Sequence, residues 1–281
     1  MLEFTVRSQL INLLFKKYFL MRPLFLGAAF LFMFSSAHAS LKIAVVDTGF
    51  CSQKALVKSK NHIVKPARDM TGPLSYDCKK VSDKDLLTSG RFHGQHVLNE
   101  FLLNLPKKIK ITIYPLVVYD KKGNQTADAW KKAIELIENE KMDMVLTASG
   151  FITEEKVVND LPSIWFVPSG RTERSITTKT VLFPQRLAPS PNLFVIGDYF
   201  DGEQIIYDQA LMYQDHIDYY FPTGKKGFSG TSRAVAEGMA RALQKCFIEK
   251  DIIAAHSLRL CLLKSSKTLQ DPILKKEFKT F

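Results

Sequence analysis

The chain has 281 residues, with 39 Lys and Arg against 28 Asp and Glu, so its formal net charge is +11. Hydrophobic residues make up 46% of it, and Gly and Pro number only 14 and 12. This composition excludes a disordered, collagenous or low-complexity chain, because it supplies enough apolar mass for a buried core. The sequence shows no period of 20–50 residues of the kind found in repeat proteins.

The first 39 residues have the three parts of a secretory signal peptide. Basic residues precede an apolar run at 24–34, which leads to the small-residue end Ala37-His38-Ala39. The run is too short to cross a bilayer comfortably, and a retained N-terminal anchor is the alternative. We expect cleavage before Ser40, export to the periplasm or the extracellular space, and no stable membrane anchor afterwards. Met21 is an alternative start, since residues 21–39 alone contain all three parts.

An exported chain keeps disulfides, and the four cysteines form an even set. Three pairings are possible, and the local one, Cys51–Cys78 with Cys246–Cys261, closes the shortest loops and is the one we expect. No two cysteines have the close spacing of zinc ligands.

The remaining charge is spread in lysine pairs without interleaved aromatic residues. This pattern favours a solvated basic face over a nucleic-acid site, so no nucleic-acid partner is expected. The pairs are Lys79-Lys80, Lys107-Lys108, Lys121-Lys122 and Lys131-Lys132.

Residues 40–281 are predicted to form one α/β domain. Apolar, β-branched runs predict strands, and apolar residues at helical spacing predict a helix at 126–141 and another beginning near Ser232. The predicted strands are 41–46, 111–118, 143–148, 163–167 and 193–196. Continuous apolar strands alternating with helices favour a parallel sheet covered on both faces, with functional groups at the carboxyl ends of its strands.

Three glycine-containing motifs carry candidate catalytic residues. Asp47-Thr48-Gly49 ends the first strand, where an α/β fold can hold a fixed carboxylate. His93-Gly94-Gln95-His96 opens an apolar helical stretch and supplies a candidate base. His93 and His96 as a metal pair is the alternative, but the His-Glu-x-x-His pattern and an evident third ligand are missing, and His96 is expected to be a core residue.

The third motif, 227–234, feeds Ser232 into a helix rich in small residues. A hydroxyl there lies beside backbone N–H groups that can stabilise an oxyanion, whereas the simpler interpretation is a helix-capping serine. Together the three motifs supply the orienting acid, base and nucleophile of a catalytic triad: Asp47, His93 and Ser232.

The three motifs, in this order, resemble those of the subtilisin-like serine proteases, and the likeness extends over nearly all of residues 40–281. The resemblance implies a doubly wound α/β fold with a mostly parallel central sheet and helices on both faces. It also implies an exported serine endopeptidase that acts on polypeptides through an acyl-enzyme. Ala148, Ser149 and Gly150 would then be the edge segment that pairs with the substrate backbone.

The sequence departs from the family pattern at the oxyanion hole. Where the family usually has Asn, the aligned residue is Arg171, which either donates to the oxyanion itself or points to solvent and leaves a weak enzyme. A catalytically weak or inactive peptide-binding relative is therefore the alternative function.

Other departures concern the helix after the serine and the region before Asp47. Arg233 and Ala236 stand where Met and Pro are usual; Arg233 either restricts access to the nucleophile and favours acidic substrates, or is an exposed helix residue.

Between Ala39 and Asp47 there is no room for a pro-domain. Either the protein folds unaided, or a separate folding helper or inhibitor protein assists it, or little activity needs restraint.

No cofactor or metal is expected, since no Asp-rich loop suggests the calcium site common in this family. An exported sugar- or ion-binding module also fits the composition but leaves the three motifs unexplained.

Overall fold

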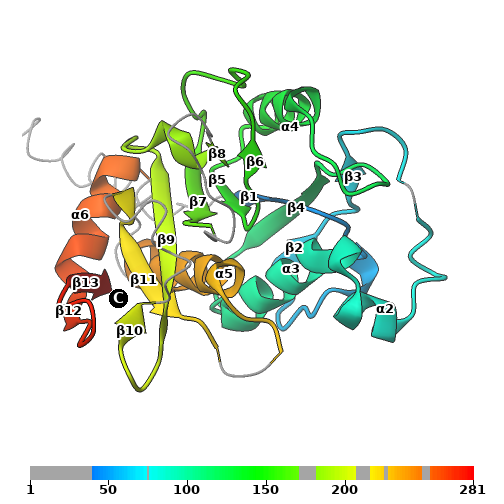
Figure 1. The fold of residues 1–281 in the computed structure, drawn as a ribbon. Helices are drawn as coiled ribbons and strands as arrows, with labels where there is room; N and C mark the ends of the chain where they lie inside the picture. Colours follow the sequence, from blue (N-terminus) through cyan, green and yellow to red (C-terminus); the bar gives the residue numbers. More distant parts are fainter. Residues whose placement is uncertain (1–39, 75, 171–181, 207–215, 225–226, 249–253) are drawn as a thin grey trace, which may run out of the picture. The chain divides into compact units, whose positions relative to one another are not determined.

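A computed structural model describes residues 40–74, 76–170, 182–206, 216–224, 227–248 and 254–281 (Figure 1). The predicted signal peptide and Arg171 lie outside these residues. Within them the chain alternates between strands and helices. The strands are β1 (Leu41–Asp47), β2 (His62–Val64), β3 (Arg68–Asp69), β4 (Ile111–Val117), β5 (Met144–Thr147), β6 (Phe151–Ile152), β7 (Ile164–Pro168), β8 (Leu182–Phe183), β9 (Leu193–Phe200), β10 (Ile205–Ile206), β11 (Tyr219–Pro222), β12 (Lys267–Gln270) and β13 (Glu277–Thr280).

Five α-helices lie among the described residues. They are α2 (Asp83–Thr88), α3 (His93–Asn104), α4 (Ala127–Asn139), α5 (Thr231–Ala242) and α6 (Ala255–Ser265). Short 3-10 helices occur at Ser52–Lys54, Gly90–Phe92 and Gln185–Leu187, and a π-helix at Leu243–Ile248 follows α5 directly. The predicted strands and both predicted helices are confirmed to within four residues at their ends.

Nine of the described strands form one mostly parallel sheet. Its order is β10-β9-β7-β5-β1-β4-β2, with β11 added beside β9 and β3 beside β4. β1 pairs in parallel with both β4 and β5, and only β10 runs antiparallel to its neighbour. The expected α/β class with a mostly parallel central sheet is therefore confirmed.

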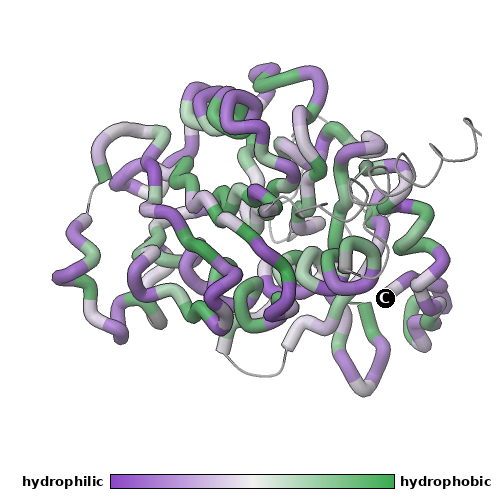
Figure 2. Tube along the Cα trace, turned by 180° about the vertical axis from the view of Figure 1, so that it is seen from behind, coloured by the Kyte–Doolittle hydropathy of each residue, from purple (hydrophilic) through white to green (hydrophobic). Residues whose placement is uncertain are grey.

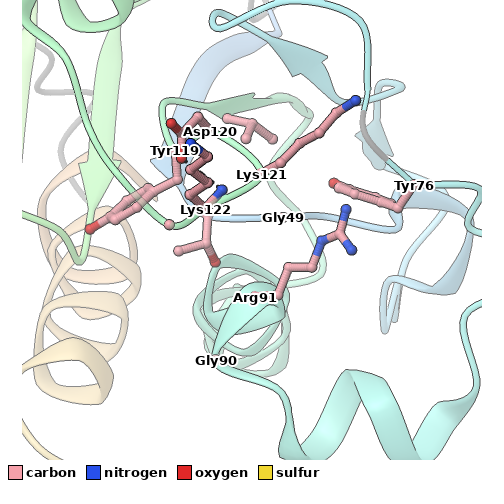
Figure 3. Close-up of a pocket in the computed structure, with 11 residues that line it drawn as sticks. Gly49, Tyr76, Gly90, Arg91, Tyr119, Asp120, Lys121 and Lys122 are labelled. Carbon is pink, nitrogen blue, oxygen red and sulfur yellow. Dashed lines mark hydrogen bonds between the residues drawn. The ribbon is translucent and has the colours of Figure 1, made fainter.

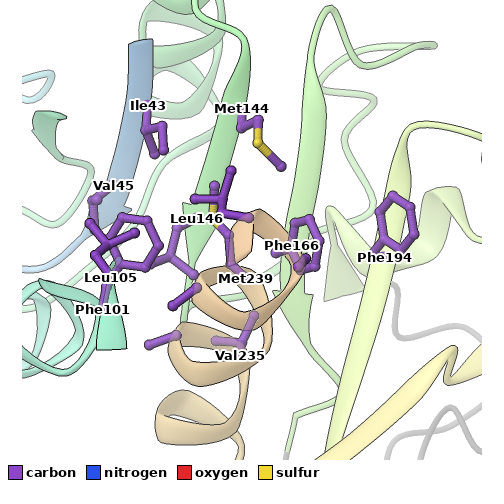
Figure 4. Packing of buried hydrophobic residues seen from close by; sticks show 14 of the residues in the cluster. Ile43, Val45, Phe101, Leu105, Met144, Leu146, Phe166, Phe194, Val235 and Met239 are labelled. Carbon is purple, nitrogen blue, oxygen red and sulfur yellow. The ribbon is translucent and has the colours of Figure 1, made fainter. Parts of the chain in front are cut away.

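Alternate residues of β1 enter two separate cores, which shows that helices cover both faces. Ile43 and Val45 pack with residues of α3 and α5, and Figure 4 shows Val235 and Met239 of α5 on this face. Ala44 and Val46 pack on the opposite face with α4. A strand with both faces buried has no polar positions to alternate, so residues 43–46 of β1 form an uninterrupted apolar run.

Helix α4 shows how local sequence sets the boundaries of an element. The Thr126 hydroxyl caps its first turn by accepting the Ala129 N–H at 3.1 Å. Its apolar residues, including the fully buried Trp130, face the core. Lys131 and Lys132 are 41% and 53% exposed. Hydrophobic and hydrophilic colours therefore alternate along α4 (Figure 2).

Both expected disulfides are present, at Cys51–Cys78 and Cys246–Cys261. The first ties the segment after β1 to the segment before α2, and the second ties the π-helix to α6. None of the helices in the described ranges is long and apolar enough to cross a membrane.

Candidate active site

The carboxyl ends of three neighbouring strands meet at one edge of the sheet. β1 ends at Asp47, β4 at Val117 and β5 at Thr147, and parallel pairing places these ends together. The residues that follow each strand therefore surround a common site, as is usual in open α/β sheets.

Asp47 and His93 are joined directly at this edge. The Asp47 side chain is fully buried, and its Oδ1 lies 2.8 Å from Nδ1 of His93. The same oxygen accepts the Thr48 N–H at 2.7 Å, which fixes the carboxylate beside its own strand end. Since Nδ1 faces Asp47, the ring's Nε2 is directed away from the carboxylate.

Close packing of α3 on the end of β1 requires the glycine after His93. The Gly94 N–H donates to Oγ1 of Thr48 at 2.9 Å. A Cβ on Gly94 would lie 2.7 Å from the Phe50 ring and 2.9 Å from Cβ of Asp47, both closer than atoms can approach. The His-Gly pair of the motif thus sets the distance between the imidazole and the carboxylate.

An aromatic ring from the glycine-containing turn lies against both histidines. The Phe228 ring is 5.6 Å from the His93 ring in an edge-to-face arrangement and 5.6 Å from the His96 ring, on which it stacks. His96 is half-buried rather than the core residue expected. Sequence reasoning missed Phe228, since nothing in a Gly-Phe-Ser-Gly turn indicates which ring it meets.

Ser232 lies in the first turn of α5, partly exposed, just after Gly230 with φ +82°. Residues on both sides of Ser232 in the sequence contact α3. Phe228, before it, touches His93, and Arg233, after it, binds Glu100. Helices α3 and α5 pack along the same face of the sheet. The structure therefore joins Asp47 to His93 and places the Ser232 turn against the helix that carries His93.

Arg233 is held by ion pairs and is not the exposed helix residue that was one of the two expectations for it. Its side chain is 22% exposed, and its guanidinium lies 3.2 Å from Glu100 and 2.9 Å from Glu237 and donates to the Pro222 carbonyl at 2.9 Å. Arg241 also pairs with Glu237. Arg233 thus links α5 to α3 and to β11. One of its carboxylate partners lies on its own helix and the other on α3.

Ala148, Ser149 and Gly150 follow β5, and their polar groups are largely engaged. Gln125 Nε2 donates to the Gly150 carbonyl at 3.0 Å, and the Tyr119 hydroxyl donates to Oγ of Ser149 at 3.1 Å. Leu182 covers Gly150, where an added Cβ would lie 2.5 Å from its side chain. A substrate strand pairing here would use the second lone pair of the Gly150 carbonyl.

Tyr119 is a site residue that sequence reasoning missed. It follows β4 and comes close enough to Asp47 for the carboxylate charge to act on it. Burial, with the Asp47 charge as the second cause, raises the pKa of Tyr119 well above its usual value. Its hydroxyl therefore stays protonated and remains a donor to Ser149.

A pocket of about 350 Å³ opens beside Asp47, between the end of β1 and the loop after β4 (Figure 3). Thr48 and Gly49 form its floor, Tyr76 and Arg91 line one side, and residues 119–123 line the other. Across the described ranges, no three His, Cys, Asp or Glu side chains cluster as metal ligands.

Comparison with known proteins agrees with this architecture at the level of fold. No family model and no curated protein matches the sequence. Among solved structures, the chain is similar to the prenylagaramide maturation protease PagA, with a TM-score of 0.55 and 15% identity over 82% of this chain and 84% of PagA. The chain is therefore similar in fold to a protease.

Proposed function

We propose that the chain is an exported serine endopeptidase with Asp47, His93 and Ser232 as its catalytic triad. The observation that carries this proposal is the 2.8 Å contact between buried Asp47 and Nδ1 of His93, on the helix that packs against the Ser232 turn. A carboxylate so placed holds the imidazole in the tautomer that carries its proton on Nδ1, so that the unprotonated Nε2 is the nitrogen that acts as the base.

The proposed reaction proceeds through an acyl-enzyme. Ser232 Oγ attacks the scissile carbonyl while Nε2 of His93 takes its proton, and the imidazolium is stabilised by Asp47. His93 then gives that proton to the leaving amine as the peptide C–N bond breaks. A water, deprotonated by His93, attacks the ester, and the proton returns to Ser232 as the carboxylic acid leaves.

The backbone N–H of Ser232, at the N-terminus of α5, supports an oxyanion in this scheme. Arg171, the second donor suggested by the sequence, lies outside the described residues. Export is supported by the signal-like residues 1–39 and by two disulfides, which persist in oxidising compartments. Residues 40–281 form the peptidase domain in this proposal, and a polypeptide is its substrate.

A peptide-binding relative without turnover is the second candidate, favoured by Arg171 in the family's Asn position and by the engaged edge at Gly150. A fluorophosphonate probe separates the two, because it labels only an activated serine. Residues 40–281, produced under oxidising conditions, should be labelled, and the Ser232→Ala variant should not. Absence of labelling in protein with a native near-UV circular dichroism spectrum would exclude turnover and favour peptide binding.

A further inference from the structure

The pocket beside the triad shares a wall with it. Thr48 and Gly49 follow Asp47 directly in the chain, and Oγ1 of Thr48 accepts the N–H of Gly94, the residue after His93. A ligand in this pocket therefore lies beside Thr48, and Thr48 is hydrogen-bonded to the residue that follows His93, the proposed base.

Three cationic side chains line the pocket from its two sides (Figure 3). Arg91 comes from the turn before α3, and Lys121 and Lys122 come from the loop after β4. Both lysines are exposed, and neither forms an ion pair with any residue in the described ranges. The Lys121-Lys122 pair, expected to belong to a solvated basic face, thus lies at a concave site.

Two carboxylates lie near this positive charge, and both are hydrogen-bonded within their own loops. Asp120 also lines the pocket, but its Oδ1 accepts the N–H groups of Lys122 and Asn124, each at 2.8 Å. These bonds, with the nearby Lys122 charge as a smaller cause, lower the pKa of Asp120. Asp69, near Tyr76, accepts the N–H and hydroxyl of Thr71 in the same way.

Arg91 is held in place rather than free to fold away. Its guanidinium carbon lies 5.0 Å from the centre of the Tyr76 ring, in cation–π geometry. The Tyr76 hydroxyl accepts the Phe50 N–H at 2.7 Å and donates to the Phe50 carbonyl at 2.9 Å. The Cys51–Cys78 disulfide joins the same two segments. The wall that carries Arg91 is therefore preorganised.

We propose that this pocket binds the side-chain carboxylate of an Asp or Glu in the polypeptide substrate, one to three residues from the scissile bond. An extended chain advances about 3.3–3.6 Å per residue, so such a side chain reaches the pocket while the scissile carbonyl lies at the triad. Arginine and lysine at a concave, partly desolvated site favour a carboxylate over its amide isostere. This inference rests on the proposed function.

The test uses acetylated, C-terminally amidated hexapeptide libraries in which each position in turn is fixed as Glu, Gln, Asp or Asn. Cleavage by residues 40–281 should prefer the acid over its amide at one position by about fivefold to tenfold in kcat/KM. The preference should shrink as NaCl is raised, since salt screens exposed charges. Equal cleavage of acid and amide at every position would overturn the inference.

Paired variants assign the preference to the pocket. Lys121→Gln/Lys122→Gln should reduce the acid-over-amide ratio at least threefold. Lys107→Gln/Lys108→Gln removes the same charge from an exposed turn before β4, at the opposite end of that strand, and should keep the ratio. A ratio unchanged in the first variant would contradict the inference, and so would an equal decrease in both.

A second readout separates this inference from the proposed function. The Ser232→Ala variant cannot turn over, so its binding of the same peptides, measured by fluorescence anisotropy, reports the pocket alone. Fluorophosphonate labelling without an acid preference in binding would overturn the pocket and leave the protease proposal standing. An acid preference without labelling would overturn the protease proposal and leave the pocket as a peptide-binding site. A library with free C-termini shows whether a terminal carboxylate replaces the side chain.

Discussion

The ring of Phe228 meets the imidazole of His93 edge to face, with 5.6 Å between the ring centres. The same ring stacks on His96 one helical turn further along α3. Phe228 precedes Ser232 by four residues, so one short turn supplies both the proposed nucleophile and a contact that limits how the base can rotate.

Replacing Phe228 should weaken catalysis while leaving the fold intact. Phe228→Ala removes an aromatic pair worth about 0.5–1.5 kcal/mol, so we expect kcat to fall about 3- to 10-fold as His93 gains rotational freedom. KM should change less. Phe228→Tyr keeps the aromatic face and serves as the matched control; an unaltered kcat in the Ala variant would show that the ring does not position His93.

Asp47→Asn tests the orientation of the imidazole. The Asn amide can present an N–H to Nδ1 and stabilise the tautomer that carries its proton on Nε2. We expect kcat to fall on the order of 10⁴-fold, as happens in triads of this kind. Rates of fluorophosphonate labelling should fall as well. Asp128→Asn, on the exposed side of α4, is the control for loss of a carboxylate. A loss of only a few fold would argue against the triad.

The ion pairs of Arg233 should contribute to stability, because Glu100 and Glu237 are only 15% and 6% exposed. Arg233→Met leaves both carboxylates without this partner, and we expect a loss of about 3 kcal/mol in the free energy of unfolding. Urea denaturation measures it, and a double-mutant cycle with Glu100→Gln should give a coupling above 0.5 kcal/mol in magnitude. Additive effects would mean that the two side chains do not interact in solution.

His62 makes stability depend on pH. Burial lowers the pKa of His62 below its usual value near 6.5, and its Nε2 lies 3.1 Å from the Pro106 carbonyl. The unfolded chain therefore binds a proton more readily than the folded one. The contribution of His62 is fully present above pH 6.5, and it is lost as the pH falls below that value toward the folded-state pKa.

The slope should approach at most about 1.4 kcal/mol per pH unit for this one proton. Chemical denaturation at a series of pH values measures it. His62→Gln retains a donor for Pro106 but cannot titrate, so its slope between pH 5 and 7 should be smaller than that of the native chain. Equal slopes would place the titration elsewhere.

The parts of the fold that the sequence predicts are those with a local cause. Apolar runs such as 41–46 and 193–196 predict strands because buried parallel strands need no polar face. The local pairing Cys51–Cys78 follows from loop length. Two-residue strands such as β3, and the four-residue strands β12 and β13, are too short for a pattern that identifies them, and they were not predicted.

The candidate site likewise contains some residues that the sequence predicts and others that it does not. Asp47, His93 and Ser232 stand in motifs that can be recognised from sequence, whereas Arg91 and Tyr119 reach the site only through the tertiary arrangement. The ion pairs of Arg233 were not predicted for a related reason, since its partner Glu100 lies on another helix. Their roles depend on segments distant in sequence, which composition and periodicity do not encode.

Formation of the Cys51–Cys78 disulfide bears on when the pocket wall becomes rigid. Tyr76, which holds Arg91 in place, lies two residues from Cys78, and the bond joins that segment to the end of β1. In a reducing compartment the bond does not persist, so this wall would depend on noncovalent contacts alone. If the chain is exported as proposed, it would gain the covalent tie of this wall only on reaching an oxidising compartment, so synthesis of the polypeptide would precede the full rigidity of the proposed binding surface.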